Sequence, residues 1–341
     1  NRHAFILPYA NLHTARFPMT DFRKIVWVSN DKYPNQIASI RFMAIMPAAY
    51  LGGRVCVFEK NFNAASFIKV NQPEVLILTK QFDGFDSLLR LATHAKSVGV
   101  PIISVFCDWH FDDAERARID SELCKLSDAV VVQTPQMKEA VEKHFGKAGF
   151  IIDEPYFNPR VAPRFSPQPG VVKLFWCGHP SNFDTLPYGL RQLSRLSVKR
   201  IQLEMMSIEA PPTSLYSKVA WRVPVDYTCI PFSIEAQKKS MEKCDFVIIP
   251  SLATPTKLIK PANRPVAAIQ SGRFAVAHPL PSYKELADYC WCGDDLREGI
   301  EWALDHPGEA MARIEKGQIY VENRFSLEAV CARWKEVIAG V

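Results

Sequence analysis

Residues 101–133 read PIISVFCDWHFDDAERARIDSELCKLSDAVVVQ, and they indicate the fold class. The stretch begins with an apolar run rich in β-branched residues over Pro101–Cys107, and it ends with a second such run over Ala129–Gln133. Between the two runs, Asp113–Lys125 has the length and polarity of a surface helix. Strands that are apolar throughout and are joined through a helix are typical of parallel sheets with helices on both faces.

The same succession recurs along the first part of the chain. The predicted strands there are Lys24–Ser29, Arg54–Glu59, Val75–Thr79, Pro101–Cys107 and Ala129–Gln133. The predicted helices are Asn35–Leu51, Phe85–Gly99, Asp113–Lys125 and Pro135–Phe145. Short strands that alternate with helices predict successive βαβ units and therefore a doubly wound sheet.

A proline-rich break follows, and the succession then resumes. Glu154–Gly170 contains five prolines without periodicity, which predicts an inter-domain linker. The predicted strands beyond it are Val172–Cys177, Arg200–Met206, Val225–Ile230, Phe246–Ile249, Phe274–Ala277 and Asp288–Cys292. The predicted helices are Asp184–Leu196, Ile234–Lys243, Ala262–Ser271, Tyr283–Leu286, Leu296–Asp305, Gly308–Asn323 and Ser326–Ala339.

These elements predict an α/β protein of two Rossmann-like, doubly wound domains, which we expect over residues 1–160 and 161–325. A C-terminal helix over 326–341 is expected to pack back on the first domain. Ligands of such sheets bind beyond the carboxyl ends of the strands. We therefore expect the two domains to face each other across a cleft at those strand ends.

Composition narrows the class of function. The chain has 341 residues, of which 48% are hydrophobic and 23% charged, and its net charge is +5 without a basic tail. This charge pattern disfavours a nucleic-acid partner and fits either a phosphate-bearing substrate or an anionic membrane surface. No apolar run reaches the roughly 18 residues that span a bilayer, and residues 1–20 do not read as a signal peptide. We expect a cytoplasmic protein, with peripheral contact at the inner membrane face left open.

The nine cysteines are scattered and mostly embedded in apolar runs. Cys290 and Cys292 form C-x-C, and no second ligand pair follows them. Buried reduced thiols are therefore favoured over a zinc site. No D-x-D triplet follows a strand either, so no metal or other cofactor is predicted.

Two segments of the second half have the chemistry of a phosphate site. Gly178 follows a predicted strand directly, and Ser181, Asn182 or Asp184 precede or begin the next helix. This arrangement fits an anion at a helix N-terminus, or an ordinary strand-to-helix turn with a capping residue. Farther on, Lys257, Lys260, Asn263 and Arg264 gather before a predicted helix, with Pro261 expected in its first turn.

Cations are unfavourable at a helix N-terminus. The cluster at Lys257–Arg264 is therefore better explained by an anion bound between side chains and backbone N–H groups, such as a diphosphate. The alternative is a solvated basic face.

In the first half, Asp108 and His110 follow the strand Pro101–Cys107, and Asp112 or Asp113 is expected to cap the next helix. Asp108 or His110 at a strand end can take a proton from a hydroxyl group or hydrogen-bond to it.

Several of these segments together resemble GT-B glycosyltransferases, especially the family-4-like group (glycosyl transferases group 1). Residues 260–285, K-x-x-N-R-x-x-x-A-I-Q-S-G-x-x-x-V-A-x-P-L-P-S-Y-K-E, resemble the donor-site segment of that group. Lys125–Pro135 resembles a strand late in its N-terminal domain, Leu174–Ser181 resembles the opening of its second domain, and Pro34–Ala44 resembles its first loop and helix. The resemblance covers roughly residues 24–340.

The resemblance implies a role for each matching residue. Lys260, Asn263 and Arg264 would hold the donor diphosphate with Lys257 nearby, and Gly178, His179 and Ser181 would approach the same phosphates. Pro281, Ser282 and Tyr283 would lie near the nucleoside. Asp108, His110 and Asp31 are the catalytic candidates, and Asn30 and Arg41 are the acceptor-side candidates. Many relatives have a Glu that grips the ribose where this chain has Ala267, and Pro265 is unusual at this helix start.

The resemblance therefore implies a glycosyltransferase that moves a sugar from a nucleotide-sugar donor to a hydroxyl acceptor on a polysaccharide, glycolipid or protein glycan. It implies transfer with retention at the anomeric carbon and without a metal, and the nucleotide is not specified. Two alternatives stay open. Ala267 favours a GT-B binding or scaffold domain without turnover. A GT-B nucleotide-sugar epimerase would need paired acid and base groups, for which Asp31, Asp108 and His110 are the candidates.

Overall fold

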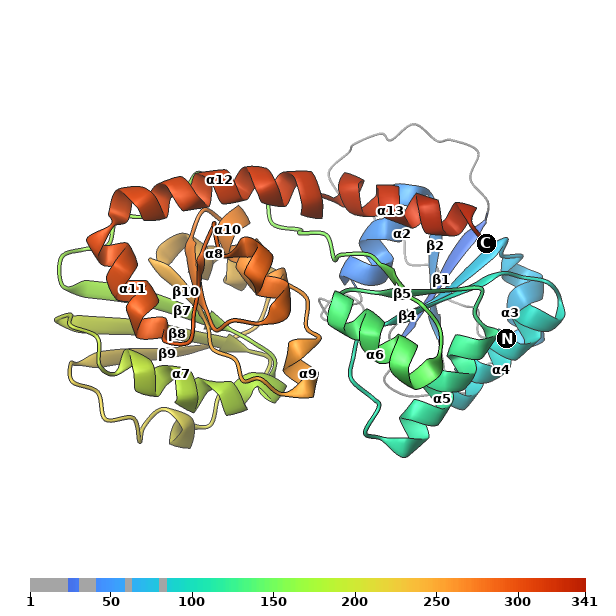
Figure 1. The fold of residues 1–341 in the computed structure, drawn as a ribbon, viewed down its shortest axis with the longest axis horizontal. Coiled ribbons are helices and arrows are strands. Elements are labelled where there is room, and N and C mark those ends of the chain that lie inside the picture. Colours follow the sequence, from blue (N-terminus) through green and yellow to red (C-terminus); the bar gives the residue numbers. More distant parts are fainter. Residues whose placement is uncertain (1–23, 31–40, 59–62, 80–84) are drawn as a thin grey trace. The chain divides into compact units, whose positions relative to one another are not determined.

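The computed structural model describes residues 24–30, 41–58, 63–79 and 85–341. It divides the chain into two compact units (Figure 1). The first comprises 1–155 together with 325–341, and the second comprises 156–324. The chain thus passes from the first unit to the second between Pro155 and Tyr156, where the sequence placed the boundary at 160, and it returns to the first unit for its last residues.

The first unit is built on a six-stranded parallel sheet with the strand order β2-β1-β3-β4-β5-β6. Its strands are β1 (Ile25–Asn30), β2 (Arg54–Phe58), β3 (Val75–Leu78), β4 (Ile102–Phe106), β5 (Ala129–Val132) and β6 (Phe150–Ile151). Its helical segments are η1 (Arg41–Ile45), α2 (Met46–Leu51), α3 (Ala64–Asn71), α4 (Phe85–Ser97), α5 (Ala114–Leu126), α6 (Pro135–Phe145) and α13 (Leu327–Ala339). Strands β3, β4 and β5 are buried along their whole length, as the apolar runs predicted.

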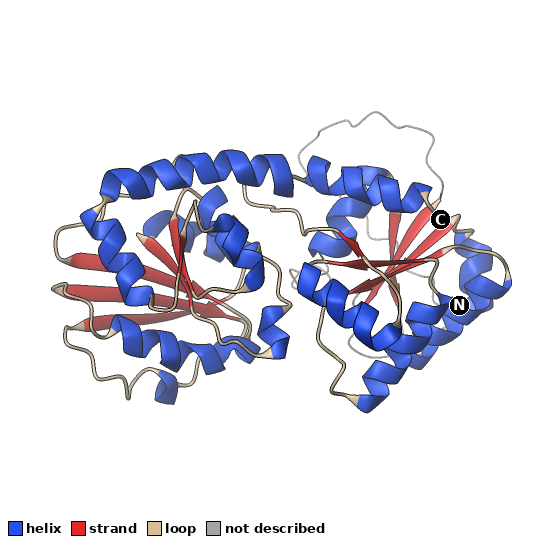
Figure 2. Cartoon of the chain, in the orientation of Figure 1, coloured by secondary structure: helices blue, strands red, loops and turns tan. Residues whose placement is uncertain are grey.

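The second unit has its own six-stranded parallel sheet, with the order β12-β11-β10-β7-β8-β9. Figure 2 shows strands in red and the helices around them in blue. Its strands are β7 (Val171–Cys177), β8 (Arg200–Ser207), β9 (Val225–Pro231), β10 (Phe246–Ile249), β11 (Phe274–Ala277) and β12 (Trp291–Cys292). Its helical segments are η2 (Pro180–Thr185), α7 (Leu186–Leu193), η3 (Thr213–Leu215), α8 (Ile234–Lys243), α9 (Pro255–Leu258), α10 (Asn263–Gln270), η4 (Pro281–Leu286), α11 (Leu296–Asp305) and α12 (Pro307–Phe325). The predicted α/β class with two doubly wound sheets is confirmed.

Several local predictions were wrong or incomplete. The helix expected over Asp184–Leu196 is a 3₁₀ turn, η2, followed by a shorter α-helix, and the helix expected over Tyr283–Leu286 is the 3₁₀ turn η4. Only the last two residues of the strand expected over Asp288–Cys292 form β12. The sequence reading missed α3, α9, η3 and the two-residue strand β6. These elements are short, so each carries too few residues to show a period.

The C-terminal helix α13 is an integral part of the first unit. It packs against α2, and its Trp334 ring meets the Trp27 ring of β1 edge to face, with 6.0 Å between ring centroids. Both rings are almost fully buried. Arg333 also forms an ion pair with Asp153, 2.5 Å between Nη1 and Oδ2, just before the chain leaves this unit. Helix α13 therefore completes the hydrophobic core that packs against β1 and α2.

The proline-rich segment is not a free linker beyond Tyr156. The N–H of Val161 donates to the carbonyl of Gln270 at the end of α10, and the N–H of Arg164 donates to the carbonyl of Gly272. The fully buried Gln318 amide of α12 donates to the carbonyl of Val161, and Phe165 lies in the core of the unit. The prolines therefore mark a packed extended segment, in which few N–H groups need partners.

Within the part of the chain that the structure describes, there is no helix with the length and apolar character needed to cross a membrane.

The contact between this segment and α10 predicts the effect of a substitution at Gly272. Its φ is +67°, and an added Cβ would lie 2.6 Å from the carbonyl oxygen of Ala162. Gly146 has a similar φ of +71° with nothing within 4 Å of an added Cβ, so it is the matched control. We expect Gly146→Ala to lower the free energy of unfolding by about 1 kcal/mol, and Gly272→Ala to lower it by about 2 kcal/mol more.

Urea unfolding of both variants measures the difference. If Gly146→Ala and Gly272→Ala lower the free energy of unfolding equally, the segment at Ala162 moves away from the added methyl group without loss of stability, and the prediction is wrong.

Candidate functional site

The strand order of the second sheet places a switch point between β7 and β10. Strand β7 pairs with β8 on one side and with β10 on the other, so the connections that leave β7 and β10 diverge to opposite sides of the sheet. Doubly wound sheets bind ligands at such a point, beyond the carboxyl ends of the strands. Gly178 directly follows β7, and Ser251 follows the end of β10. The predicted donor-site residues cluster around this point.

The turn after β7 has a tight geometry. The N–H of Gly178 donates to the carbonyl of Met206, and a Cβ at Gly178 would lie 2.6 Å from the ring of Trp176. Glycine is therefore required here by the buried tryptophan below it. His179 caps the following 3₁₀ turn, because its Nδ1 accepts from the N–H of Ser181 at 3.2 Å. The capping residue is thus His179, whereas the sequence reading considered Ser181, Asn182 and Asp184.

The basic cluster lies on two short helices. Lys257 belongs to α9, Lys260 to the turn that follows, and Asn263 and Arg264 are the first two residues of α10. The prediction of one helix start was therefore wrong, and Pro261 precedes α10 and lies outside its first turn. Pro265 occupies that first turn, where its missing N–H has no intrahelical partner to lose.

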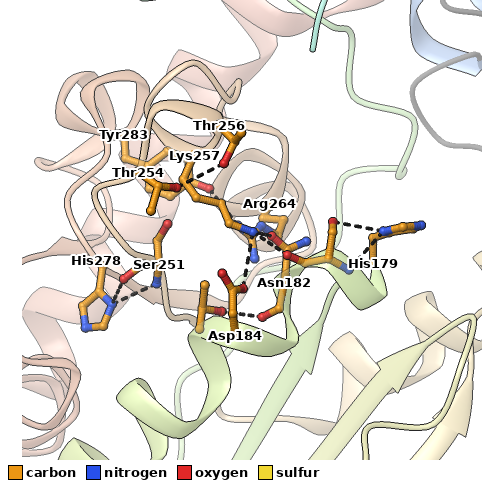
Figure 3. Close-up of polar contacts among 12 residues, drawn as sticks. His179, Asn182, Asp184, Ser251, Thr254, Thr256, Lys257, Arg264, His278 and Tyr283 are labelled. Atoms are coloured by element: carbon orange, nitrogen blue, oxygen red, sulfur yellow. Dashed lines mark hydrogen bonds and ion pairs between the residues drawn. The ribbon is translucent and has the colours of Figure 1, made fainter. Parts of the chain in front are cut away.

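Lys257 joins the two connections across the switch point (Figure 3). Its ammonium donates to the carbonyl of Ser181 at 2.7 Å and to Oδ1 of Asn182 at 2.8 Å, and it lies 3.5 Å from Oδ1 of Asp184. The residue is only 6% exposed. Burial lowers the pKa of Lys257; Asp184 opposes this shift, and the neighbouring Arg264 and Lys260 add to it.

Arg264 has an unsatisfied buried group. Its Nη2 lies 3.5 Å from the hydroxyl of Tyr283, whereas its Nη1 is buried without a hydrogen-bond partner among the described residues. Tyr283 is 1% exposed, so its ring belongs to the core and its hydroxyl contacts Arg264. Ser282 donates its hydroxyl to the carbonyl of Lys260 at 2.6 Å and so fixes the turn between α9 and α10. A buried guanidinium N–H without an acceptor is costly, and a bound anion would satisfy it.

A neutral histidine supports the same strand ends. His278 follows β11 and is 4% exposed. Its Nδ1 accepts from the N–H of Ser251 at 2.9 Å, and its Nε2 lies 2.9 Å from Oε1 of Gln192 on α7. The carbonyl oxygen of Ser251 lies equally close to Nδ1, at 2.9 Å, so an acceptor oxygen faces each ring nitrogen. Burial lowers the pKa of His278, which keeps the ring neutral. The hydroxyl of Ser251 is buried and has no partner among the described side chains.

The catalytic candidates of the first unit lie around the end of β4. Nδ1 of His110 lies 2.9 Å from Oδ2 of Asp120, and its Nε2 lies 2.8 Å from Nη1 of Arg116. Both ring nitrogens are therefore engaged within the protein. Asp108 and His110 line a small hollow of about 40 Å³ together with Asp120. Asp113 caps α5, as the sequence predicted.

The acceptor-side candidates are described only in part. Asn30 ends β1 and Arg41 begins η1, and only their backbone is described. Asp31 lies outside the described residues. Within the described ranges, no group of three or more His, Cys, Asp or Glu side chains is arranged to hold a metal ion. All nine cysteines are free thiols.

The sequence reading missed Asn182 and Asp184 as partners of Lys257, and it missed Ser251, His278 and Gln192 altogether. Asn182 and Asp184 were noted only as possible capping residues. The signal for both residues was their position: His278 directly follows β11, and Ser251 lies two residues after β10. Both strands are apolar and end at the sheet edge where ligands bind.

Comparison with solved structures shows the fold that this geometry belongs to. HepE from Anabaena, in complex with UDP-glucose, superposes with a TM-score of 0.69 at 11% identity, over 94% of this chain and all of HepE. Sucrose-phosphate synthase from Thermosynechococcus elongatus gives a TM-score of 0.69 at 11% identity, over 93% of this chain and 98% of that one. An α-glucosyltransferase in complex with UDP gives 0.65 at 10% identity, over 93% and 99% of the two chains.

The chain therefore has the GT-B fold of these glycosyltransferases, as the sequence resemblance predicted. No family model matches the sequence, and no curated protein matches it either.

His278 predicts a pH dependence of stability. Its pKa in the folded protein lies below the ordinary value of 6.5, so the unfolded chain takes up this proton at a higher pH than the folded one. Stability is therefore lost as the pH falls below 6.5, and the loss levels off below the folded pKa. We expect urea unfolding between about pH 8 and about pH 5 to show a steeper fall for the wild type than for His278→Gln. Parallel pH profiles for the two proteins would contradict the buried neutral histidine.

Proposed function

We propose that this protein is a glycosyltransferase that moves a sugar from a nucleotide-sugar donor to a hydroxyl acceptor. The observation that carries the proposal is the cationic cluster at the switch point, in which the buried Nη1 of Arg264 has no acceptor among the described residues. Solved structures of the same fold contain UDP or UDP-glucose, which supports a nucleotide-linked donor. The retaining, family-4-like assignment rests on the sequence resemblance.

We propose that the cationic cluster stabilises the departing nucleoside diphosphate. Negative charge develops on the leaving diphosphate as the glycosidic bond breaks, and prearranged donors lower the barrier when they are aimed at that charge. Asn263 and Arg264 begin α10, Lys260 lies in the turn before it, and these three residues are proposed to supply the donors. Because side chains supply the positive charge in this proposal, we propose transfer without a metal ion.

We also propose roles for Asp108 and His110, which follow β4 in the first unit. Asp108 is proposed to act on the acceptor hydroxyl as a base or hydrogen-bond acceptor. His110 is proposed to hold the loop after β4, since both its ring nitrogens are engaged by Asp120 and Arg116. A polysaccharide, a glycolipid and a protein glycan are the acceptor classes we propose, and a lipid-linked acceptor would bring the protein to a membrane surface.

A thermal-shift panel tests donor binding. We expect at least one of UDP, ADP, GDP and UDP-glucose to raise the melting temperature, because a ligand at 100 times its dissociation constant stabilises a fold by about 2.7 kcal/mol. Arg264→Ala should abolish the shift. Arg200→Ala removes an equal charge from an exposed ion pair with Asp226 in the same unit, so it is the control and should keep the shift.

Absence of a shift with every nucleotide would contradict the proposed function. A shift without hydrolysis or transfer of the matching nucleotide sugar would instead support the scaffold alternative that Ala267 raised.

A further inference from the structure

Lys257 differs from the other cations of the cluster in how its charge is used. The three acceptors around its ammonium, Ser181, Asn182 and Asp184, all belong to the turn after β7. An ammonium has three N–H donors. Two of them bond to Ser181 and Asn182, and the Asp184 carboxylate lies 3.5 Å from the nitrogen. The side chain is also almost fully buried. A phosphate oxygen would have to compete with these partners for the ammonium.

Arg264 shows the opposite arrangement, with a buried Nη1 that meets no acceptor in the described part of the chain. The two cations therefore have different tasks although they lie on neighbouring short helices. The guanidinium of Arg264 can bind an anion, whereas the ammonium of Lys257 is bonded to the turn at Pro180–Thr185 and holds it in place. That turn also has internal bonds: His179 accepts from the N–H of Ser181, and the hydroxyl of Thr185 donates to the carbonyl of Asn182.

The electrostatic situation of Lys257 indicates that this contact has a functional purpose. Its only carboxylate neighbour among these three acceptors, Asp184, is 3.5 Å away with a side chain that is 53% exposed, so the buried charge is incompletely balanced. Burial and the nearby Arg264 and Lys260 disfavour the charged form, as the lowered pKa of Lys257 shows. If this contact only stabilised the fold, a neutral hydrogen-bond donor could make it without the desolvation free energy of a buried charge. An anion bound at Arg264 would balance the excess positive charge.

We propose that Lys257 is a positioning residue, which acts through Asn182 to hold the turn carrying His179 and Ser181 in the arrangement that receives the donor diphosphate. The proposal rests on the proposed function, because the turn faces the donor site only if that site exists. It assigns Lys257 an indirect role in place of direct phosphate contact.

The first experiment needs no ligand and tests the contact itself. We expect Lys257→Met to raise the amide hydrogen-exchange rates of residues 181–186 by at least about tenfold, because the turn loses its tie to α9. Lys239→Met removes an exposed lysine of α8 and is the charge-matched control, with unchanged exchange in the turn. Unchanged exchange in Lys257→Met would overturn the proposal, whatever the protein binds.

The second experiment separates positioning from direct contact. Titration calorimetry with UDP and with inorganic pyrophosphate is carried out on the wild type, Lys257→Met, Asn182→Ala and the double variant. We expect each single variant to bind both ligands about tenfold more weakly than the wild type. The double variant should bind no more weakly than Lys257→Met, because both substitutions remove the same hydrogen bond between Lys257 and Asn182. Asn182→Ala lies on a partly exposed turn and keeps the test usable if Lys257→Met folds poorly.

The outcomes are distinguishable. If Asn182→Ala binds pyrophosphate as the wild type does while Lys257→Met does not, Lys257 contacts the phosphates directly and the positioning role is wrong. If the wild type binds neither UDP nor pyrophosphate, the assignment to a diphosphate site fails, and the exchange experiment still shows whether Lys257 holds the turn.

Discussion

The parallel pairing of β7 with β10 is the constraint on which the candidate site depends. It joins Leu174 to Phe246 and Phe175 to Val247, all of them buried. Because the chain leaves β7 toward β8 and leaves β10 toward β11, the two connections part at the carboxyl edge, which is where sheets of this kind bind ligands. The deep burial of these strands fixes the positions at which Gly178 and Ser251 emerge. Every polar group of the site is placed relative to those two points.

The switch point brings positive charge together. Lys257 lies on α9 and Arg264 on α10, and the carboxylate of Asp184 lies 3.5 Å from the Lys257 ammonium. Lys257 is held by the opposite turn, and the guanidinium of Arg264 keeps one buried nitrogen for which the described residues supply no acceptor. An uncompensated cationic group is unfavourable in the unliganded protein, and it becomes favourable when an anion binds. Stability is thus given up at the position where we propose that the diphosphate binds.

The sequence was sufficient for the layered architecture but not for the local geometry of the site. Continuous apolar strands and regular helices predicted both sheets, because burial imposes a pattern on every residue of such an element. Short segments escaped prediction: α9 has four residues, and η2 is a 3₁₀ turn where an α-helix was expected. The tie between Lys257 and Asn182 joins residues 75 positions apart, and no local pattern reports such a contact. The burial of Tyr283 was missed because the resemblance assigned it a ligand role.

The central claim is that a nucleoside diphosphate binds where the Gly178 turn meets the start of α10. A crystal structure of the protein with UDP tests it most directly. The account predicts that the diphosphate lies at the β7–β10 switch point, with an oxygen within hydrogen-bond distance, about 2.7–3.2 Å, of Nη1 of Arg264. A diphosphate bound elsewhere, with that nitrogen still lacking an acceptor, would contradict the account.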